Sequence, residues 1–295
     1  MNVGLIDVDG HNFPNLALMK ISAWHKSQGD HAEWWDGFTC YDRIYMSKVF
    51  TTEYSPDALE PCNANEIVKG GTGYGLENKL PDYIEHLFPD YSLYPQFSDT
   101  AYGFLTRGCP RGCKFCIVAE KEGRCSRKVA DLSEFWRGQR HIELLDPNIL
   151  ASPDHMDLLQ QIVKSKAWVN FNQGLDVRLI NKENMELINQ VKTKMFHFAW
   201  DWPEWDMIPY FETFQKLTTC KDNRKKRVYV LTNFGSTHDQ DLYRINTLRR
   251  LGFDPYVMIY EKSTAPHITR QLQRWCNNKF IFWSCEQFED YGGNK

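Results

Sequence analysis

Short apolar runs alternate along the chain with longer segments in which apolar positions recur every three or four residues. A short apolar run is typical of a buried strand, and the longer period is typical of an amphipathic helix. Before residue 76 the pattern predicts a helix at 15–28 and strands at 3–8, 31–35, 43–47 and 66–69. The last strand leads into a glycine-rich turn. This order predicts a small doubly wound α/β unit, whose ligands would sit at the carboxyl ends of the strands.

A segment rich in proline and aromatic residues, 77–98, follows the small unit. It predicts a connector laid over a surface, with one short helix at 80–88, because so many aromatic side chains would seek burial. We therefore predict two domains: a small α/β domain with its connector at 1–92, and a larger domain at 93–295.

From residue 101 onward, predicted strands and helices alternate regularly. The predicted strands are 101–106, 141–146, 168–172, 195–201, 228–234 and 254–260. The predicted helices are 132–136, 154–165, 184–191, 202–205, 208–218, 242–251 and 268–275, and the apolar segment 280–282 closes the series. Regular alternation of this kind predicts βα units on a parallel sheet, with chemistry on the loops that follow the strands.

Composition and charge narrow the setting of the protein. Of the 295 residues, 42% are hydrophobic, which is enough for a sizeable core. The net charge is −3, so the chain as a whole is not basic. No apolar run approaches the roughly 20 residues of a membrane helix, and no basic segment precedes the apolar N-terminus. Nine cysteines, an odd count, argue against a disulfide framework. We expect a cytoplasmic protein without a membrane partner, and nucleic-acid partners stay open. The basic loop 220–227 is either a solvated turn or a contact for an acidic partner or reductant.

The densest chemistry in the chain is the sequence Cys-Pro-Arg-Gly-Cys-Lys-Phe-Cys, which directly follows the predicted strand 101–106. It places Cys109, Cys113 and Cys116 at C-x3-C-x2-C spacing. Thiolates are soft, charged ligands that favour iron and zinc. Three of them on one loop predict a 4Fe–4S cluster with one iron open to a small molecule, because a closed cluster uses four cysteines. The alternative is a structural zinc ion with Cys125 as the fourth ligand.

With the aromatic Phe115 before its last cysteine, this stretch resembles the signature of the radical S-adenosylmethionine (SAM) enzymes. The resemblance implies a partial (β/α)6 barrel preceded by a small Rossmann-like α/β unit. It also implies that SAM chelates the open iron through its amino and carboxylate groups and is cleaved to a 5′-deoxyadenosyl radical. The radical would abstract hydrogen from a substrate that the sequence does not identify. An electron donor such as flavodoxin or ferredoxin would be a partner, and Phe115 would pack near the adenine.

The resemblance also implies SAM contacts on the strand ends. Arg178 would pair with the SAM carboxylate, and Asp201 would lie near the SAM ribose or the substrate. The family's glycine-glycine-glutamate motif is missing, and Asp146 stands in the corresponding turn. The remaining candidates for this pocket are Asn172, Gln173, Asp176, Thr232 and Asn233. The alternatives are an ordinary surface ion pair between Asp176 and Arg178 and a helix cap at Asp201.

The small N-terminal unit resembles the cobalamin-binding domain that precedes the core in many radical SAM enzymes. The sequence Asp-Gly-His-Asn-Phe-Pro at 9–14 partly matches the motif D-x-H-x-x-G, in which the histidine, here His11, binds cobalt. Pro14 stands in the place of the glycine. The alternative is that Asp9, His11 or Asn12 caps the following helix. A cobalamin-dependent radical SAM methyltransferase is therefore one alternative function, and a non-enzymatic zinc or iron–sulfur module is another.

Overall fold

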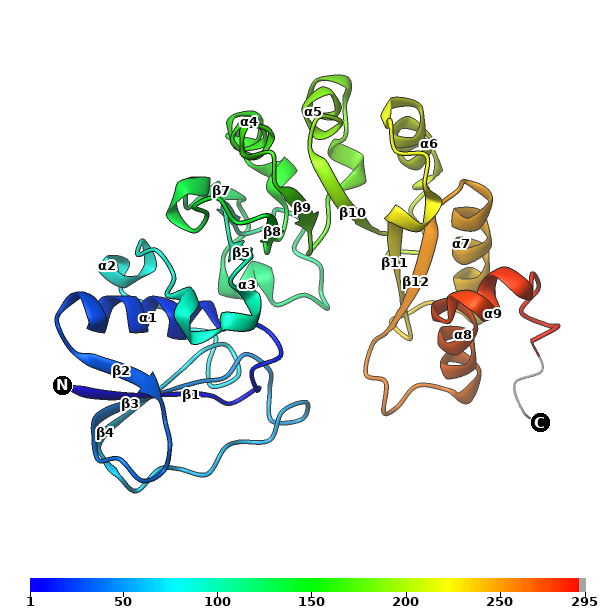
Figure 1. Ribbon diagram of the computed structural model, residues 1–295. Coiled ribbons are helices and arrows are strands. Elements are labelled where there is room, and N and C mark those ends of the chain that lie inside the picture. The colour runs from blue at the N-terminus through cyan, green and yellow to red at the C-terminus, as the bar shows by residue number, and fades with distance from the viewer. Residues whose placement is uncertain (292–295) are drawn as a thin grey trace. The chain divides into compact units, whose positions relative to one another are not determined.

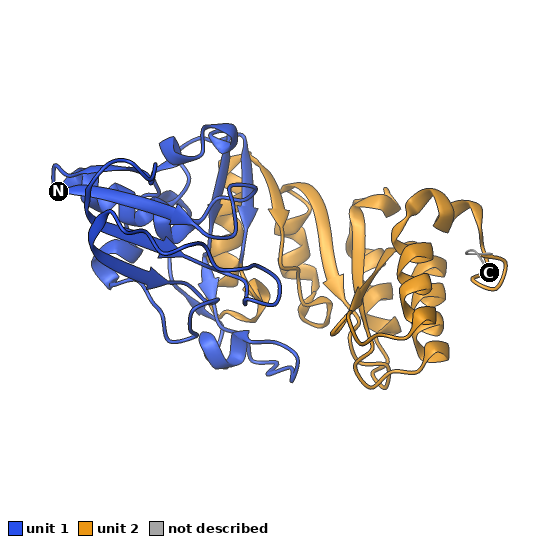
Figure 2. Ribbon diagram, turned by 90° about the horizontal axis from the view of Figure 1, so that it is seen from below, with its two compact units in different colours: residues 1–145 blue, residues 146–295 orange. Residues whose placement is uncertain are grey.

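The computed structural model describes residues 1–291 and divides into two compact units (Figure 2). The first unit is Met1–Leu145, and the second begins at Asp146. The cysteine stretch therefore belongs to the same compact unit as the N-terminal sheet. The predicted division into domains at residues 92 and 93 stays a prediction. Within residues 1–291, no helix combines the length and apolar character needed to cross a membrane.

The first unit contains a four-stranded parallel sheet with the order β2-β1-β3-β4 (Figure 1). Its strands are β1 (Asn2–Asp7), β2 (His31–Trp34), β3 (Tyr41–Ser47) and β4 (Ala64–Gly70). Helix α1 (Leu16–Ser27) connects β1 to β2. The strand order reverses beside β1, as in a doubly wound sheet, so the α/β arrangement predicted for this region is confirmed.

The core on one face of this sheet combines β1, α1 and the connector. Val3, Leu5, Leu18 and Met19 are buried together with Tyr94, which comes from the connector. The connector thus buries the ring of Tyr94, which removes a large apolar area from water, whereas its Tyr83 ring stays exposed.

Helix α1 begins at a cap that the sequence pattern did not indicate. The Oδ1 atom of Asn15 accepts a hydrogen bond from the Leu18 amide at 3.3 Å, so Asn15 is the N-cap. The prediction that Asp9, His11 or Asn12 caps this helix is therefore wrong.

Two further predicted helices are shorter than expected. The connector holds only α2 (Asp82–Glu85), η1 (Tyr91–Leu93) and η2 (Pro95–Phe97). Pro89 disfavours a helical conformation of the residue before it, which helps to limit the predicted helix 80–88 to α2. The predicted helix 132–136 is a single 3-10 turn, η3 (Leu132–Glu134).

The second sheet has six strands in the order β12-β11-β10-β9-β8-β5, and the pairings described for it are parallel. The strands are β5 (Thr100–Gly103), β8 (His141–Leu144), β9 (Trp168–Phe171), β10 (Lys192–Ala199), β11 (Lys226–Thr232) and β12 (Asp254–Ile259). All six predicted strands are present, so the α/β class is confirmed. The closure of these strands into a partial barrel stays a prediction.

Helices follow the strands of the second unit. They are α4 (His155–Ser165), α5 (Lys182–Ile188), α6 (Ile208–Leu217), α7 (His238–Arg250), α8 (His267–Asn277) and α9 (Lys279–Ser284). The segment 280–282 lies in α9. Phe198 of β10 packs against Phe211 and Phe214 of α6, with ring centroids 6.4 and 4.8 Å away. These buried rings join a strand to its following helix in one core.

The predicted helix 202–205 is instead a turn. The carbonyl oxygens of Trp200 and Asp201 accept hydrogen bonds from Arg244 at 2.7 and 3.0 Å. A helix after Asp201 would use the carbonyl of Asp201 for its first internal hydrogen bond. Because residues 202–205 form a turn and the next helix begins only at Ile208, Asp201 is not a helix cap, and that prediction is wrong.

Candidate functional site

The cysteine loop, defined here as residues 108–126, begins a few residues after the end of β5 in the sequence. Two short strands, β6 (Thr106–Arg107) and β7 (Arg127–Lys128), pair in antiparallel fashion at its base. The predicted strand 101–106 is thus divided between β5 and β6. The loop also contains the short helix α3 (Val118–Lys121), which is labelled in Figure 1. The three cysteines stand before α3, near the carboxyl end of a parallel strand, where α/β proteins bind ligands.

The backbone of the loop is closed by specific contacts. Gly108 has a φ of +86°, and a Cβ atom there would lie 2.2 Å from the carbonyl oxygen of Cys125. The amide of Cys109 donates to the carbonyl of Gly123 at 3.1 Å. The amide of Cys116 donates to the carbonyl of Cys113 at 3.0 Å, which forms a tight turn. Glycine at 108 therefore permits the close approach of the two sides of the loop.

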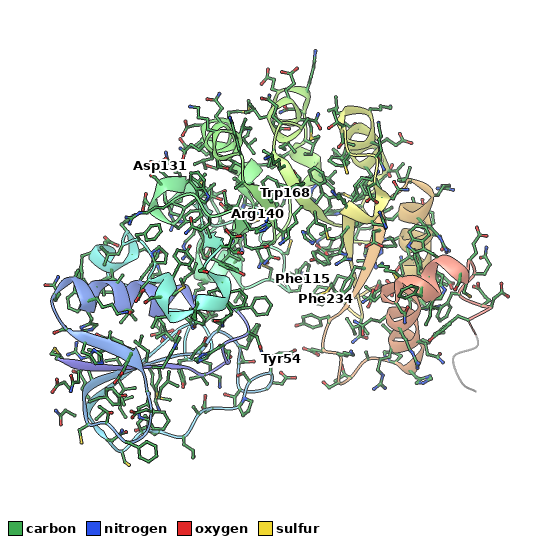
Figure 3. The ribbon with its side chains drawn as sticks, in the orientation of Figure 1. Tyr54, Phe115, Asp131, Arg140, Trp168 and Phe234 are labelled. Atoms are coloured by element: carbon green, nitrogen blue, oxygen red, sulfur yellow. The ribbon has the colours of Figure 1, made fainter. Side chains whose placement is uncertain are left out.

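The donor set of the loop suits a thiolate-bound metal. Cys109 and Cys113 are half-buried, Cys116 is exposed, and Phe115 is half-buried between the last two (Figure 3 labels Phe115). Within residues 1–291, no group of three or more His, Cys, Asp or Glu side chains is gathered around a common metal position. The fit to a cluster therefore rests on the chemistry, spacing and accessibility of the thiols.

The predicted pair Asp176–Arg178 exists in the second unit, but it is not an exposed surface pair. The Nε atom of Arg178 donates to Oδ1 of Asp176 at 2.8 Å, and the Asp176 side chain is only 5% exposed. Nδ2 of Asn148 donates to Oδ2 of Asp176 at 3.3 Å. The guanidinium of Arg178 also lies over the ring of Trp205, with Cζ 4.8 Å from the ring centroid. The guanidinium is thereby oriented, and its Nε and Nη2 atoms already form a two-bond contact with the Asp176 carboxylate.

Other candidates near this pair differ in exposure. Asp146 is buried, Asn172 is half-buried and Gln173 is exposed. The structure brings Asn148, Asp176, Arg178 and Trp205 together through the contacts above. Asn172 and Gln173 follow β9 directly, as predicted, and their role as ligand contacts stays a prediction.

Asp201 lies just after β10 and is held in a partly buried position. Burial raises the pKa of its carboxyl to about 6, although Arg244 and Arg178 act in the opposite direction. The Asp201 carboxylate therefore lies near the positive charges of Arg244 and Arg178, and no side chain among the described residues donates a hydrogen bond to it.

Thr232 and Asn233 brace the strand ends of the second unit. Nδ2 of Asn233 donates to the carbonyl of Tyr260 at 2.8 Å, and Asn233 has a φ of +61°. Oγ1 of Thr232 donates to the carbonyl of Met258 at 3.4 Å. These bonds tie the end of β11 to β12. Their predicted contact with adenine or ribose stays a prediction.

Sequence reasoning missed Arg244 and a row of aromatic rings. The rings of Trp202, Phe234 and Tyr260 follow one another with centroid separations of 5.8 and 4.8 Å (Figure 3 labels Phe234). Arg244 is fully buried and also donates to the carbonyl of Leu231 at 2.9 Å. One signal could have identified Arg244, namely Asp241 three residues earlier, directly before the predicted helix 242–251, since charges at this spacing face each other when the helix extends over both.

The carboxyl end of β1 suits cobalamin poorly. The ring of His11 packs on Trp34 with centroids 4.2 Å apart. The hydroxyl of the buried Tyr94 donates to Oδ2 of Asp7 at 2.6 Å. A side chain of the connector therefore occupies the end of β1, which is where a doubly wound sheet would receive a ligand. We derive no chemistry through this cofactor.

Comparison of the chain with protein-family models gives no match, and comparison with curated proteins gives none either. The function therefore has to be argued from the residues of this chain.

Proposed function

We propose that this chain is a radical SAM enzyme in which Cys109, Cys113 and Cys116 bind a 4Fe–4S cluster. The observation that carries the proposal is the spacing of these three thiols on one partly exposed loop near the carboxyl end of a parallel strand. Three protein thiolates leave one iron available to SAM. When bound, the cluster supplies the electron for reductive cleavage of SAM, and the resulting radical chemistry acts on a substrate not yet identified.

The second unit would supply residues that bind SAM or the substrate. Asp176 holds Nε and Nη2 of Arg178 at 2.8 and 3.3 Å, and within residues 1–291 no hydrogen bond occupies Nη1. That group can donate to a carboxylate. Asp201 can accept a hydrogen bond from a hydroxyl group, which would offset the cost of its burial. Within this proposal, an electron donor such as flavodoxin or ferredoxin reduces the enzyme.

The proposal is tested without knowledge of the substrate. Protein reconstituted anaerobically with iron and sulfide, then given dithionite and SAM, is expected to release 5′-deoxyadenosine and methionine. Cys113→Ser should abolish release, because it removes one of three ligands. Cys62→Ser is the matched control, since Cys62 is exposed outside the loop and should be dispensable. A wild-type protein that holds a full cluster and releases neither product would contradict the proposal.

Metal analysis of the same preparation addresses the alternatives. About one zinc per chain, without iron or labile sulfide, would favour a structural metal module that includes Cys125. A corrinoid absorption band that persists through purification would favour the methyltransferase alternative.

A further inference from the structure

The start of the cysteine loop is held by one carboxylate, that of Glu122. Its Oε1 atom accepts from Nη1 of Arg107 at 2.9 Å, and its Oε2 atom accepts from the Gly108 amide at 3.1 Å. The next residue, Gly123, accepts from the amide of Cys109. Glu122 is only 11% exposed. These bonds fix the backbone that leads into the first cysteine, and hydrogen bonds to a charged partner are the stronger kind.

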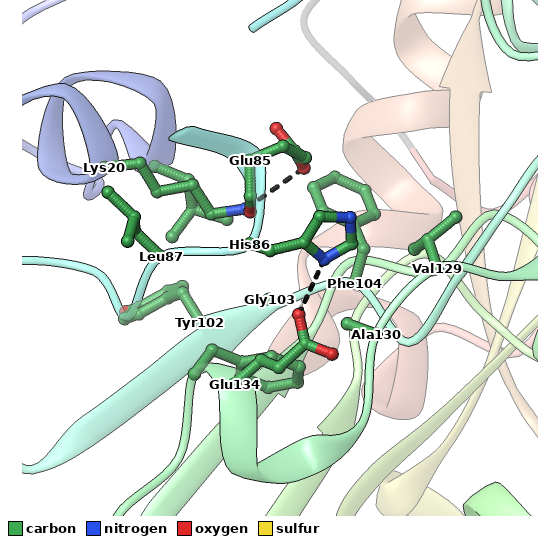
Figure 4. Close-up of a pocket in the computed structure, with 12 residues that line it drawn as sticks. Lys20, Glu85, His86, Leu87, Tyr102, Gly103, Phe104, Val129, Ala130 and Glu134 are labelled. Atoms are coloured by element: carbon green, nitrogen blue, oxygen red, sulfur yellow. Dashed lines mark hydrogen bonds and ion pairs between the residues drawn. The ribbon is translucent and has the colours of Figure 1, made fainter. Parts of the chain in front are cut away.

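The ion pairs continue from Glu122 into the N-terminal region. Nη2 of Arg107 lies 3.3 Å from Oε1 of Glu85 in α2, and Nζ of Lys20 in α1 lies 3.0 Å from the same oxygen. Figure 4 shows Lys20 and Glu85 at a small cavity beside Gly103, the last residue of β5. Lys20 is 15% exposed, so this pair is screened less than a surface pair would be. The network Lys20–Glu85–Arg107–Glu122 thus runs from α1 to the cysteine loop.

A second contact joins the loop to the turn that follows β4 of the N-terminal sheet. Nζ of Lys121, at the end of α3, donates to Oγ1 of Thr72 at 2.6 Å. Thr72 lies in the glycine-rich turn after β4. Gly71 in this turn has a φ of +94°, and a Cβ atom there would lie 2.2 Å from the carbonyl of Lys48. The turn is therefore closely packed against the end of β3, which makes Thr72 a firm anchor for α3.

We propose that the N-terminal α/β region positions the cysteine loop, with Glu122 as the central positioning residue. The identity of the metal in this inference rests on the proposed function, whereas the contacts that hold the loop do not depend on that function. The N-terminal region would then support cluster binding by holding the loop in place, and it would not bind a cofactor of its own. Glu122 acts through the backbone of Gly108 and Cys109.

The first test measures the cysteine loop in metal-free protein. Glu122→Ala is expected to raise the alkylation rate of Cys109 about tenfold, because loss of a hydrogen bond to a charged group shifts a local opening equilibrium by that order. Glu122→Gln keeps an acceptor for the Gly108 amide and should give a smaller increase, so it also serves if the alanine variant does not fold. Glu120→Ala is the control: Glu120 is exposed on α3 and makes no ion pair among the described residues. Cys220, in the second unit, is the internal reference.

The second test uses the distant end of the network. Lys20→Met should also raise the alkylation rate of Cys109 while that of Cys220 stays unchanged. After reconstitution, Glu122→Ala should lose iron to a chelator about tenfold faster than wild type, the usual scale for residues that orient metal ligands. Its reduced cluster should show an altered EPR signal. Unchanged alkylation of Cys109 in both Glu122 variants would overturn the inference. Absence of 5′-deoxyadenosine from the wild-type protein would instead count against the proposed function alone.

Discussion

At the scale of single residues, the candidate site depends on charges that are partly removed from water. Asp201 is a carboxylate whose burial raises its pKa to about 6, close to two positively charged side chains, those of Arg178 and Arg244. Raising the pKa of an acid above its unfolded value means that ionisation weakens the folded state. A carboxyl group whose pKa is shifted in this way is typical of functional sites.

The stability of the protein should therefore depend on the ionisation of Asp201. At about pH 3, below the pKa of Asp201 in both the unfolded and the folded protein, this side chain is protonated in both states and does not affect stability. As the pH rises through the pKa of Asp201 in the folded protein, the free energy of unfolding decreases. We expect Asp201→Asn to raise the free energy of unfolding by about 1–3 kcal/mol near pH 7.5 and to change it much less near pH 4. Urea unfolding of the metal-free protein at the two pH values measures this. An equal effect at both would show that Asp201 ionises normally.

At the scale of elements, one buried arginine of α7 ties together the ends of β10 and β11. Arg244 donates to the carbonyls of Trp200, Asp201 and Leu231 and pairs with the Asp241 carboxylate. Carbonyl groups that leave a strand have lost their ladder partners, and a buried carbonyl without a hydrogen bond is costly. Arg244 therefore replaces the partners that a regular helix after β10 would have supplied.

Removal of this arginine should destabilise the second unit strongly. Arg244→Met leaves the Asp241 carboxylate buried without its partner, and we expect a loss of about 3–5 kcal/mol in the free energy of unfolding. The double variant Arg244→Met/Asp241→Asn should recover part of the loss, because no buried charge remains. Arg224→Met is the control, since Arg224 pairs with Asp222 at 82% exposure and should have no measurable effect. Thermal or urea unfolding gives the comparison, and equal losses for Arg244→Met and Arg224→Met would refute it.

At the scale of the whole molecule, the chain has two compact units, and all three predicted cluster ligands belong to the first. A bound ligand stabilises the conformations that contain its binding site. It therefore slows the exchange of backbone amide hydrogens in segments whose local unfolding would destroy that site. Of the predicted SAM contacts, Phe115 belongs to the first unit, and the others belong to the second, namely Asp146, Asn172, Gln173, Asp176, Arg178, Asp201, Thr232 and Asn233. The two cofactors should therefore leave different footprints.

Hydrogen exchange measured by mass spectrometry should separate these footprints. Reconstitution with iron and sulfide is expected to slow exchange about tenfold or more in the cysteine loop and its contacts within residues 1–145. Addition of SAM should then slow exchange around residues 172–178 and 201. The Cys113→Ser variant should show neither change. Slowing confined to residues 146–291 on cluster formation would contradict the assignment of the cluster to the first unit.

The sequence predicted the strands better than the helices. All six strands of the second sheet and all four of the first were predicted, because a short run of apolar and β-branched residues bounded by turn residues is typical of a strand. The helices at 80–88, 132–136 and 202–205 proved to be short helices or turns. Local patterns could not show that Arg244 captures the Asp201 carbonyl, since that partner lies more than forty residues away in the chain.

The sequence alone determined the α/β class, the two groups of parallel strands and the three-thiol stretch, because hydrophobic period and ligand spacing are local properties. Only the tertiary structure decided that Glu122 and Lys20 support the cysteine loop, that Tyr94 occupies the end of β1, and that Asp176 is a buried partner of Arg178. These features depend on which distant side chains meet, and hydrogen-bond partners are selected by three-dimensional packing rather than by distance along the chain.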